Sequence, residues 1–291
     1  MKKKLFLFLL VALSVSPCLA QYKFSVVDFP GAAQTNIFAV DDLGKYVGAW
    51  YDSDVAGHAM YFDGKNLASL DPNGPIGTAP QSYAYSLNNL GQIAGGFIGP
   101  DNNYHGFIYR NGKITQIDFP SGNNTQAYGV NDLGQVIGVY QDSNAAFHAF
   151  TLIGGQYKNA DLPGGLLTVP FSISDRSVIV GQYRTVAHTI GHGYLELPGG
   201  KFTTYDAPGA QANSTYFISV NFWNQVLGAY ETPSGDFQNF LLANGKLKLF
   251  NVPDSFQATF VSAQTINDFG VIVGYYNDAN NLAHGFIARP E

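Results

Sequence analysis

Short apolar runs alternate with turn-forming segments along the whole chain. Between residues 125 and 162, four runs have the two-residue alternation that is typical of β-strands. They are Thr125–Asn131, Gln135–Gln141, His148–Ile153 and Gln156–Leu162. Segments rich in Asp, Asn, Gly and Ser separate these runs. The pattern predicts four antiparallel strands joined by hairpins, and residues 163–167 then cross to the next unit.

One nine-residue string marks a repeat of this unit. It reads VNDLGQVIG at Val130–Gly138 and recurs five more times, with different degrees of similarity. The other copies are Val40–Gly48, Leu87–Gly95, Ile173–Gly181, Val220–Gly228 and Ile266–Gly274. Corresponding cuts divide residues 22–291 into six units of 43 to 48 residues. Four strands per unit of this length are typical of a β-propeller blade, whereas solenoids usually have shorter repeats and polar end caps.

The sequence therefore predicts an all-β fold, a six-bladed β-propeller of four-stranded antiparallel blades. The first run, Phe24–Asp28, has the character of a fourth strand with no blade before it, and the last unit, Thr265–Ala288, has only three strands. The two ends would complete one blade, which removes the open sheet edges. We expect one domain over residues 21–291, with Phe24–Asp28 paired to His284–Ala288.

Composition supports this fold class. Hydrophobic residues make up 46% of the chain and charged residues 12%, which excludes an intrinsically disordered protein. Only three glutamates occur against eighteen aspartates. Exposed helices need Glu and Lys on their solvated faces, so a helical protein is disfavoured.

The first twenty residues have the order of a signal peptide. A basic segment, residues 1–4, precedes the apolar Leu5–Leu13 and the small-residue site Cys18–Ala20. The apolar stretch is too short to span a membrane. We expect cleavage near Ala20 and a secreted or periplasmic bacterial protein. Lipidation of Cys18 is the alternative reading.

Charge narrows the range of partners. Without the three lysines of the signal segment, 12 basic residues face 21 acidic ones, a formal net charge of −9. Such a surface repels a phosphate backbone, so we expect no nucleic-acid partner. We also expect a monomer without a membrane span, whose partner is a glycan or an extracellular protein.

Five histidines recur at the start of the third strand, each with an aspartate at the end of a fourth strand. The expected pairs are His58 with Asp71, His105 with Asp118, His148 with Asp161, His192 with Asp206, and His284 with Asp28. Two-residue hairpin turns place such partners opposite each other. Blade five has lost both, with Gln238 and Asn251 in their places. We interpret the row as structural pairs and expect neither catalysis nor metal binding from it.

The unit resembles the HAF repeat of bacterial extracellular repeat proteins. His148-Ala149-Phe150 spells the motif, and the variants YHGF and AHGF occur at Tyr104–Phe107 and Ala283–Phe286. The resemblance covers essentially the whole mature chain and is weakest in blades four and five. It implies export and a propeller-like repeat fold, and it implies no reaction.

The remaining candidate site residues lie on what we call the loop face, the end of the propeller with the links between second and third strands. They are Asp52, Asp54, Asp101, Tyr104, Asp142, Arg184, His188 and Asp278. Their oxygens would suit calcium, with Asp52 and Asp54 as candidate ligands. The alternative is that Asp and Asn are simply turn formers. No complete calcium loop is present, so we expect no cofactor.

Catalytic motifs are absent from the sequence: it contains no GxSxG, HExxH, P-loop or dinucleotide-binding turn. Two hypotheses follow. The first is a secreted, non-catalytic propeller that binds a glycan, a cell-surface component or a protein through its loop face. The second is a secreted propeller enzyme, a lyase or hydrolase acting on polysaccharide, whose carboxylates assemble across a cleft.

Export generates the first testable prediction. Because the basic, apolar and small-residue segments are in the correct order, we expect the exported protein to begin at Gln21. Intact-mass measurement of protein recovered outside the cytoplasm checks this. A species that retains Met1, or one with a diacylated Cys18, would contradict it.

Overall fold

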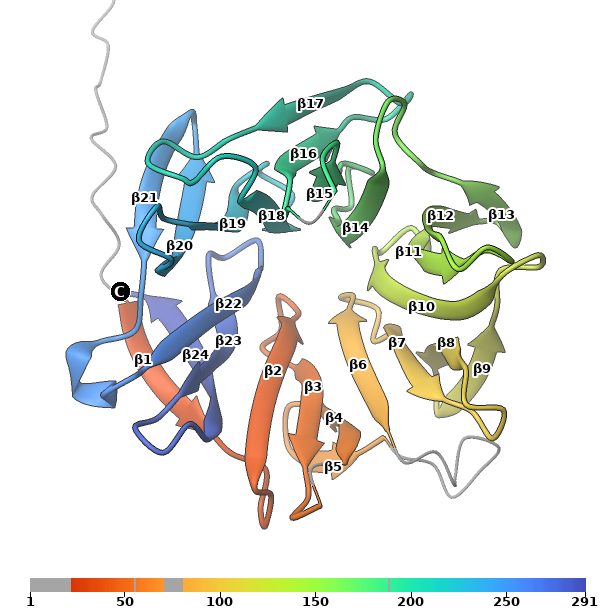
Figure 1. Cartoon of the computed structure of the whole chain (residues 1–291). Coiled ribbons are helices and arrows are strands. Elements are labelled where there is room, and N and C mark those ends of the chain that lie inside the picture. The colour runs from red at the N-terminus through yellow and green to blue at the C-terminus, as the bar shows by residue number, and fades with distance from the viewer. Residues whose placement is uncertain (1–21, 55, 71–80, 188) are drawn as a thin grey trace, which may run out of the picture.

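The computed structural model describes residues 22–54, 56–70, 81–187 and 189–291. Within these ranges six four-stranded antiparallel sheets surround a common axis (Figure 1). The predicted six-bladed propeller is confirmed. The expected signal segment, residues 1–20, lies outside the described residues.

Each blade runs from an inner strand at the axis to an outer strand at the rim. The inner strands are β2 (Gln34–Val40), β6 (Ser82–Leu87), β10 (Asn123–Val130), β14 (Leu167–Ile173), β18 (Thr215–Val220) and β22 (Phe260–Ile266). The second strands are β3 (Tyr46–Tyr51), β7 (Ile93–Ile98), β11 (Val136–Gln141), β15 (Ile179–Arg184), β19 (Val226–Glu231) and β23 (Ile272–Asn277).

The third and fourth strands complete the blades. The third strands are β4 (Gly57–Phe62), β8 (Tyr104–Arg110), β12 (Phe147–Ile153), β16 (His192–Glu196), β20 (Phe237–Ala243) and β24 (Ala283–Pro290). The outer strands are β5 (Leu67–Ser69), β9 (Lys113–Ile117), β13 (Gln156–Asn159), β17 (Phe202–Tyr205), β21 (Lys246–Phe250) and β1 (Tyr22–Val27). A short 3₁₀ helix, Asp254–Phe256, lies between β21 and β22.

The ring closes through its N-terminal strand, as predicted. In blade six β1 pairs antiparallel with β24, and Phe24 lies opposite Ala288 while Val27 lies opposite Gly285. Figure 1 shows the red β1 beside the blue β24. The two chain ends thus form one blade, which gives it the same four strands as the other five.

Apolar side chains between neighbouring blades form the core. One cluster joins Ala94 of blade two to Val136, Tyr140 and Phe150 of blade three. Phe150 is fully buried. Burying such a side chain contributes about 1.5–3 kcal/mol, so the six interfaces hold the wheel together. Among the described residues, no helix is both long and apolar enough to cross a membrane.

Threonines fix the links from one blade to the next. At the start of β10, the buried Thr125 accepts a hydrogen bond through Oγ1 from the backbone N–H of Phe119, at 3.0 Å. The same bond is made by Thr35, Thr168 and Thr215. Each bond satisfies a backbone donor in the link between an outer strand and the following inner strand.

Ring closure generates the second prediction. Removing residues 21–30 deletes β1 and leaves β24 as an open edge, which is a template for pairing with other chains. We expect aggregation or loss of a cooperative thermal transition, measured by light scattering and calorimetry on the mature protein. A truncated chain that stays soluble and melts at the same temperature would show that β1 does not hold the ring closed.

Candidate ligand site on the propeller axis

A cavity of about 330 Å³ lies on the axis, and all six blades contribute to its wall. The residues come from the ends of the inner strands and from the turns that lead into the second strands. These turns lie at the opposite end of the propeller from the loop face, and we call this end the turn face. The structure therefore places this axial cavity at the end that sequence reasoning did not select.

A β-bulge aims one residue of each inner strand into this cavity. In β10, Ala127 lies opposite Gly138 and Gly129 lies opposite Ile137, so Tyr128 has no partner in the register. A bulge redirects a side chain in this way. The residues skipped in the six inner strands all line the cavity: Phe38, Tyr85, Tyr128, Phe171, Ile218 and Gln264.

The glycine opposite each bulge makes it possible. A Cβ on Gly138 would collide with the backbone carbonyl oxygen of Gln126 on the inner strand. Gly48, Gly95, Gly181 and Gly274 face inner-strand carbonyl oxygens in the same way. The repeated glycine is therefore a requirement of the close approach of two backbones at the bulge.

Four of the bulged residues form an aromatic belt around the cavity. Ring centroids are 5.9 Å apart for Phe38 and Tyr85, 5.2 Å for Tyr85 and Tyr128, and 6.0 Å for Tyr128 and Phe171. Burial raises the pKa of Tyr85, and it raises that of Tyr128 to about 12. Both phenols are therefore neutral at physiological pH and keep their O–H donors.

Asparagines in the turns below the belt connect each blade to the next. Asn131 accepts a hydrogen bond through Oδ1 from the N–H of Gln135, at 3.0 Å, and its Nδ2 donates to the carbonyl oxygen of Ser174 in blade four, at 2.9 Å. Asn88, Asn221 and Asn267 make equivalent pairs of bonds. One side chain thus stabilises both its own turn and a blade interface.

The residue after each turn asparagine belongs to a second hydrogen-bonded ring. The N–H of Asn89 donates to Oδ1 of Asp132 at 2.8 Å, and the N–H of Asp132 donates to Oδ1 of Asp175 at 2.7 Å. Phe222 donates to Asp268, Asp268 to Asp42, and Asp42 to Asn89. The ring is broken only after Asp175, because blade five has Phe222 and no carboxylate at this position. The cavity is thus surrounded by carboxylate and amide groups.

The electrostatic environment of this ring is acidic. Burial raises the pKa of Asp175 and of Asp268, and the neighbouring carboxylates raise both further. Asp41, Asp42 and Asp132 also line the cavity, while none of the described lining residues is Lys, Arg or His. A group that enters the cavity therefore meets hydrogen-bond acceptors and negative charge.

Exposed apolar side chains surround the mouth of the cavity. They occupy the same turn position in five of the six blades and are between 64% and 71% exposed: Leu43, Leu90, Leu133, Trp223 and Phe269. In blade four the position is Arg176, whose guanidinium carbon lies 5.4 Å from the ring centroid of Phe222. Such a patch around a cavity is typical of a binding surface.

Of the loop-face residues predicted from the sequence, none that the structure describes lines this cavity. Asp142 accepts hydrogen bonds through Oδ1 from the N–H groups of Asn144 and Ala146, at 2.8 and 2.9 Å. Asp52, Asp101 and Asp278 accept bonds within their own loops too. These aspartates thus make the contacts of turn formers.

The other predicted loop residues are placed separately. Asp54 is exposed, and Tyr104 begins β8 with its N–H bonded to Asn124 Oδ1 at 2.9 Å. Arg184 ends β15, and its Nε is buried without a partner. His188 lies outside the described residues. Within the described ranges no group of three or more His, Cys, Asp or Glu is arranged to hold a metal ion.

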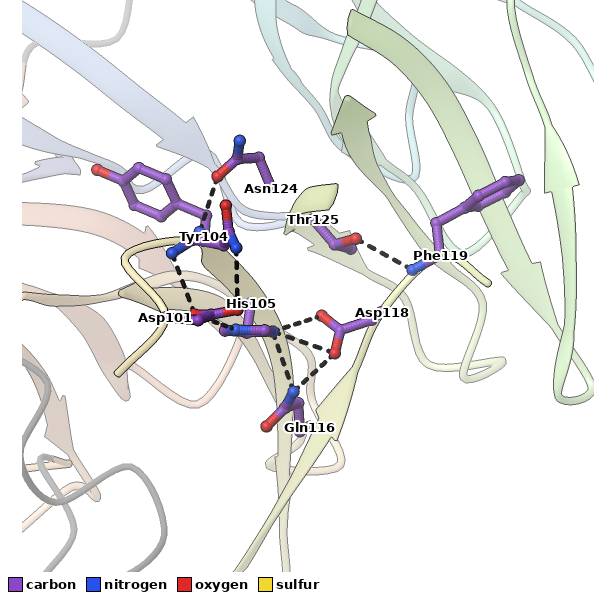
Figure 2. A network of polar contacts seen from close by, with 9 residues as sticks. Asp101, Tyr104, His105, Gln116, Asp118, Phe119, Asn124 and Thr125 are labelled. Atoms are coloured by element: carbon purple, nitrogen blue, oxygen red, sulfur yellow. Dashed lines mark hydrogen bonds and ion pairs between the residues drawn. The ribbon is translucent and has the colours of Figure 1, made fainter. Parts of the chain in front are cut away.

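Each repeated histidine contacts at least one aspartate of its own blade, and His105, His148 and His284 each lie between two. Figure 2 shows His105 between Asp118, 3.1 Å from Nδ1, and Asp101, 3.0 Å from Nε2. His148, His192 and His284 have their Nδ1 within 3.0 Å of Asp161, Asp206 and Asp28. His58 lies 3.3 Å from Asp52, and its expected partner Asp71 lies outside the described residues. In blade five no hydrogen bond joins Gln238 to Asn251, both of which are described.

The histidines also stack on the second strand. Tyr140 lies directly opposite His148 in the register, with ring centroids 5.3 Å apart, and Trp50 stacks on His58 at 4.3 Å. His58, His105, His148 and His284 are therefore each held by an aromatic ring and by aspartate of the same blade, whereas His192 is held by Asp206. None of them lines the axial cavity.

Hydrogen bonds to aspartate favour the protonated form of two of these histidines. Burial opposes the charged form of His105, but its hydrogen bonds to Asp101 and Asp118 outweigh burial and raise its pKa. The bond to Asp161 raises the pKa of His148. The side chain of Asn103 and that of His105 lower the pKa of Asp101.

No protein-family model and no curated protein matches the sequence. Solved propellers resemble the structure. The Aleuria aurantia lectin in complex with alpha-methyl-L-fucoside is 14% identical, with a TM-score of 0.56 over 90% of this chain and 93% of the lectin. AofleA from Arthrobotrys oligospora is 15% identical, with a TM-score of 0.57 over 91% and 86%.

A third similar structure is an enzyme. Virginiamycin B lyase from Staphylococcus aureus, in an inactive form with quinupristin, is 11% identical, with a TM-score of 0.50 over 91% of this chain and 99% of the lyase. At these identities the likeness shows the fold alone.

The histidine row generates the third prediction. Replacing His105 or Asp118 by Ala removes a charge-assisted hydrogen bond and leaves the partner with only its bond to Asp101 or Gln116, so each change should cost on the order of 1–3 kcal/mol of unfolding free energy. The double replacement should cost less than the sum of the two. Denaturant titration of the four proteins measures the coupling.

The cost should also depend on pH. Because the folded pKa of His105 is raised, its stabilisation is complete below about pH 6.5 and is lost as the pH rises through the folded value. The lowered pKa of Asp101 adds stability above about pH 4, which is lost as the pH falls through its folded value. His105→Ala should therefore destabilise more at about pH 5.5 than at about pH 8.5. An equal cost at both values would contradict this account.

Proposed function

We propose that this protein is an exported, non-catalytic binding protein, and that it binds a glycan in the cavity at the turn face. The resemblance to HAF-repeat proteins supports export, and the expected signal peptide agrees with it. As in the sequence analysis, the proposed ligand is a glycan. Its proposed site is now the turn face and no longer the loop face.

The observation that carries this proposal is the layered wall of the cavity. Four aromatic rings, Phe38, Tyr85, Tyr128 and Phe171, lie next to a ring of carboxylates and amides. A sugar has apolar C–H faces that pack on aromatic rings and hydroxyl groups that donate to such oxygens. A concave, mostly apolar site with a few fixed polar groups is the usual form of a small-ligand pocket.

The loop face supports a ligand less well. Asp52, Asp101, Asp142 and Asp278 accept hydrogen bonds from their own loops and lie near their own histidines. A ligand at that face would have to displace contacts that the fold already uses.

A second candidate function is the polysaccharide lyase or hydrolase. One observation favours it: the carboxyls of Asp175 and Asp268 converge on the cavity with raised pKa values, as an acid–base pair would require. Against it, Oδ1 of each accepts a neighbouring backbone N–H, so these groups already have a structural role.

The fourth prediction tests the site. Tyr128→Leu removes a ring from the belt while keeping apolar bulk, so it should weaken binding of a glycan selected on an array by about tenfold, the loss of roughly 1.4 kcal/mol of contact. Tyr109→Leu is the matched control, because Tyr109 lies on β8 and does not line the cavity. Isothermal titration measures both.

The same experiment separates the two candidate functions. Incubation of the glycan with excess protein, followed by chromatography, should return it unchanged. A shortened or unsaturated product would favour the enzyme. No array hit, or equal effects of Tyr128→Leu and Tyr109→Leu, would contradict glycan binding at this cavity. His105→Ala should leave the affinity unchanged.

A further inference from the structure

One position of the turn ring departs from the repeat in a way that leaves a buried carboxyl oxygen without a hydrogen-bond partner. Asn88, Asn131, Asn221 and Asn267 occupy this position in four blades, but blade one has Asp41. Asp41 lies among the residues that line the cavity, and only 3% of it is exposed. Its Oδ2 is buried and has no hydrogen-bond partner.

The local turn does not need this carboxylate. Oδ1 of Asp41 accepts the N–H groups of Leu43 and Lys45, at 2.9 and 2.8 Å, which an asparagine oxygen would do equally well. What the aspartate lacks is the Nδ2 that the four asparagines have. In each case this Nδ2 donates to a backbone carbonyl oxygen in the turn of the following blade. For Asn267 of blade six, the acceptor is the backbone carbonyl oxygen of Asp41 in blade one.

Asp41 thus lowers stability at a site where Asn would raise it. Burial raises the pKa of Asp41, which outweighs the opposing bonds from Lys45 and Leu43. By linkage, a raised pKa means that ionised Asp41 disfavours the folded state as the pH rises. Residues that break a local rule at a cost in stability are characteristic of functional sites.

Two bases lie near the rim, and neither neutralises this carboxylate. Lys45 follows in the same turn and lowers the pKa of Asp41 slightly, but no ion pair joins their side chains, both of which are described. Arg176 of blade four packs on Phe222. Five aspartates therefore line the cavity, and the Oδ2 atom of one of them, Asp41, is buried without a partner. None of the described lining residues carries a positive charge.

We propose that the axial cavity selects a glycan with a protonated amino group, an amino sugar without its N-acetyl group, and that Asp41 is the residue that pairs with the ammonium. This inference rests on the proposed function and names the ligand class of the same site. An ammonium supplies three donors to acceptor-only oxygens. The adjacent aromatic belt offers it ring faces as well.

The charge of the site makes the opposite class unsuitable. Uronic acids and sulfated sugars would bring anions next to Asp41, Asp42, Asp132, Asp175 and Asp268, and like charges at short range repel. A basic peptide also carries ammonium groups but has no sugar ring. The experiment therefore includes a peptide as a third ligand.

The fifth prediction uses two trisaccharides with the same sugar backbone, one with free amino groups and one with N-acetyl groups in their place. Glucosamine trimer and N-acetylglucosamine trimer are titrated calorimetrically into the mature protein at about pH 6, where most of the amino groups carry a proton. We expect the charged trimer to bind at least tenfold more tightly, the difference of a charge-assisted over a neutral hydrogen bond. Added salt should reduce this preference.

Asp41→Asn gives the decisive variant, because its two effects have opposite signs. The amide restores the hydrogen bond of the repeat, so the melting temperature should rise, and it removes the charge, so the affinity for glucosamine trimer should fall about tenfold. Asp236→Asn is the matched control. It makes the same charge change at an exposed turn on the loop face and should alter neither quantity.

The outcomes separate this inference from the function on which it rests. Equal or tighter binding of the N-acetylated trimer, or an Asp41→Asn protein that is more stable with unchanged affinity, overturns the amino-sugar inference and leaves glycan binding standing. Equal losses in Asp41→Asn and Asp236→Asn would reveal only non-specific attraction. Binding of a lysine tripeptide as tightly as the charged trimer would replace the glycan by a peptide. If neither trimer binds but a neutral glycan does, and Tyr128→Leu abolishes that binding, the amino-sugar inference is wrong and glycan binding at the cavity still holds.

Discussion

The asparagine at the start of the inner turn, present in four of the six blades, makes the interaction on which the wheel depends. Its oxygen closes the turn between the first two strands, and its nitrogen reaches the carbonyl of the next blade. Because both bonds come from one planar amide, the shape of the turn and the angle between blades are fixed together. A buried, fully satisfied amide of this kind favours one arrangement over looser ones. The blades therefore meet at a defined angle, and six of them close the ring.

The site follows from the same constraint. Once the turns are held at the axis, the inner strand must bulge to accommodate the twist, and the bulged residue has only the axis to face. The glycine opposite, such as Gly138, is what lets the two backbones approach. Aromatic residues at the bulge and acidic residues at the turn then meet in one cavity because the backbone repeats, although they are distant in sequence.

Much of this fold could be predicted from the sequence, since hairpin phase is a local property. The spacing of His105 and Asp118, and the lone first strand Phe24–Asp28, both reflect strands that are neighbours in the sheet. The cavity could not be predicted in the same way. The role of Asn131 depends on a blade 43 residues away, and sequence spacing within a unit says nothing about contacts between units. The signal was present in the repeated Asn-Asp of the turns, which the rules of turn formation explain equally well.

The irregular positions of a repeat carry more information about function than the regular ones. A regular residue is explained by the blade, as His148 is explained by Asp161 and Tyr140. The two rings at the turn face break at Asp41, at Ser174 and at Phe222, which all line the cavity, and the break at Asp41 leaves a buried oxygen without a partner. A ring of six identical turns would be the more stable molecule. These three departures all lie in the wall of one cavity on the axis, which is the physical reason to place recognition there.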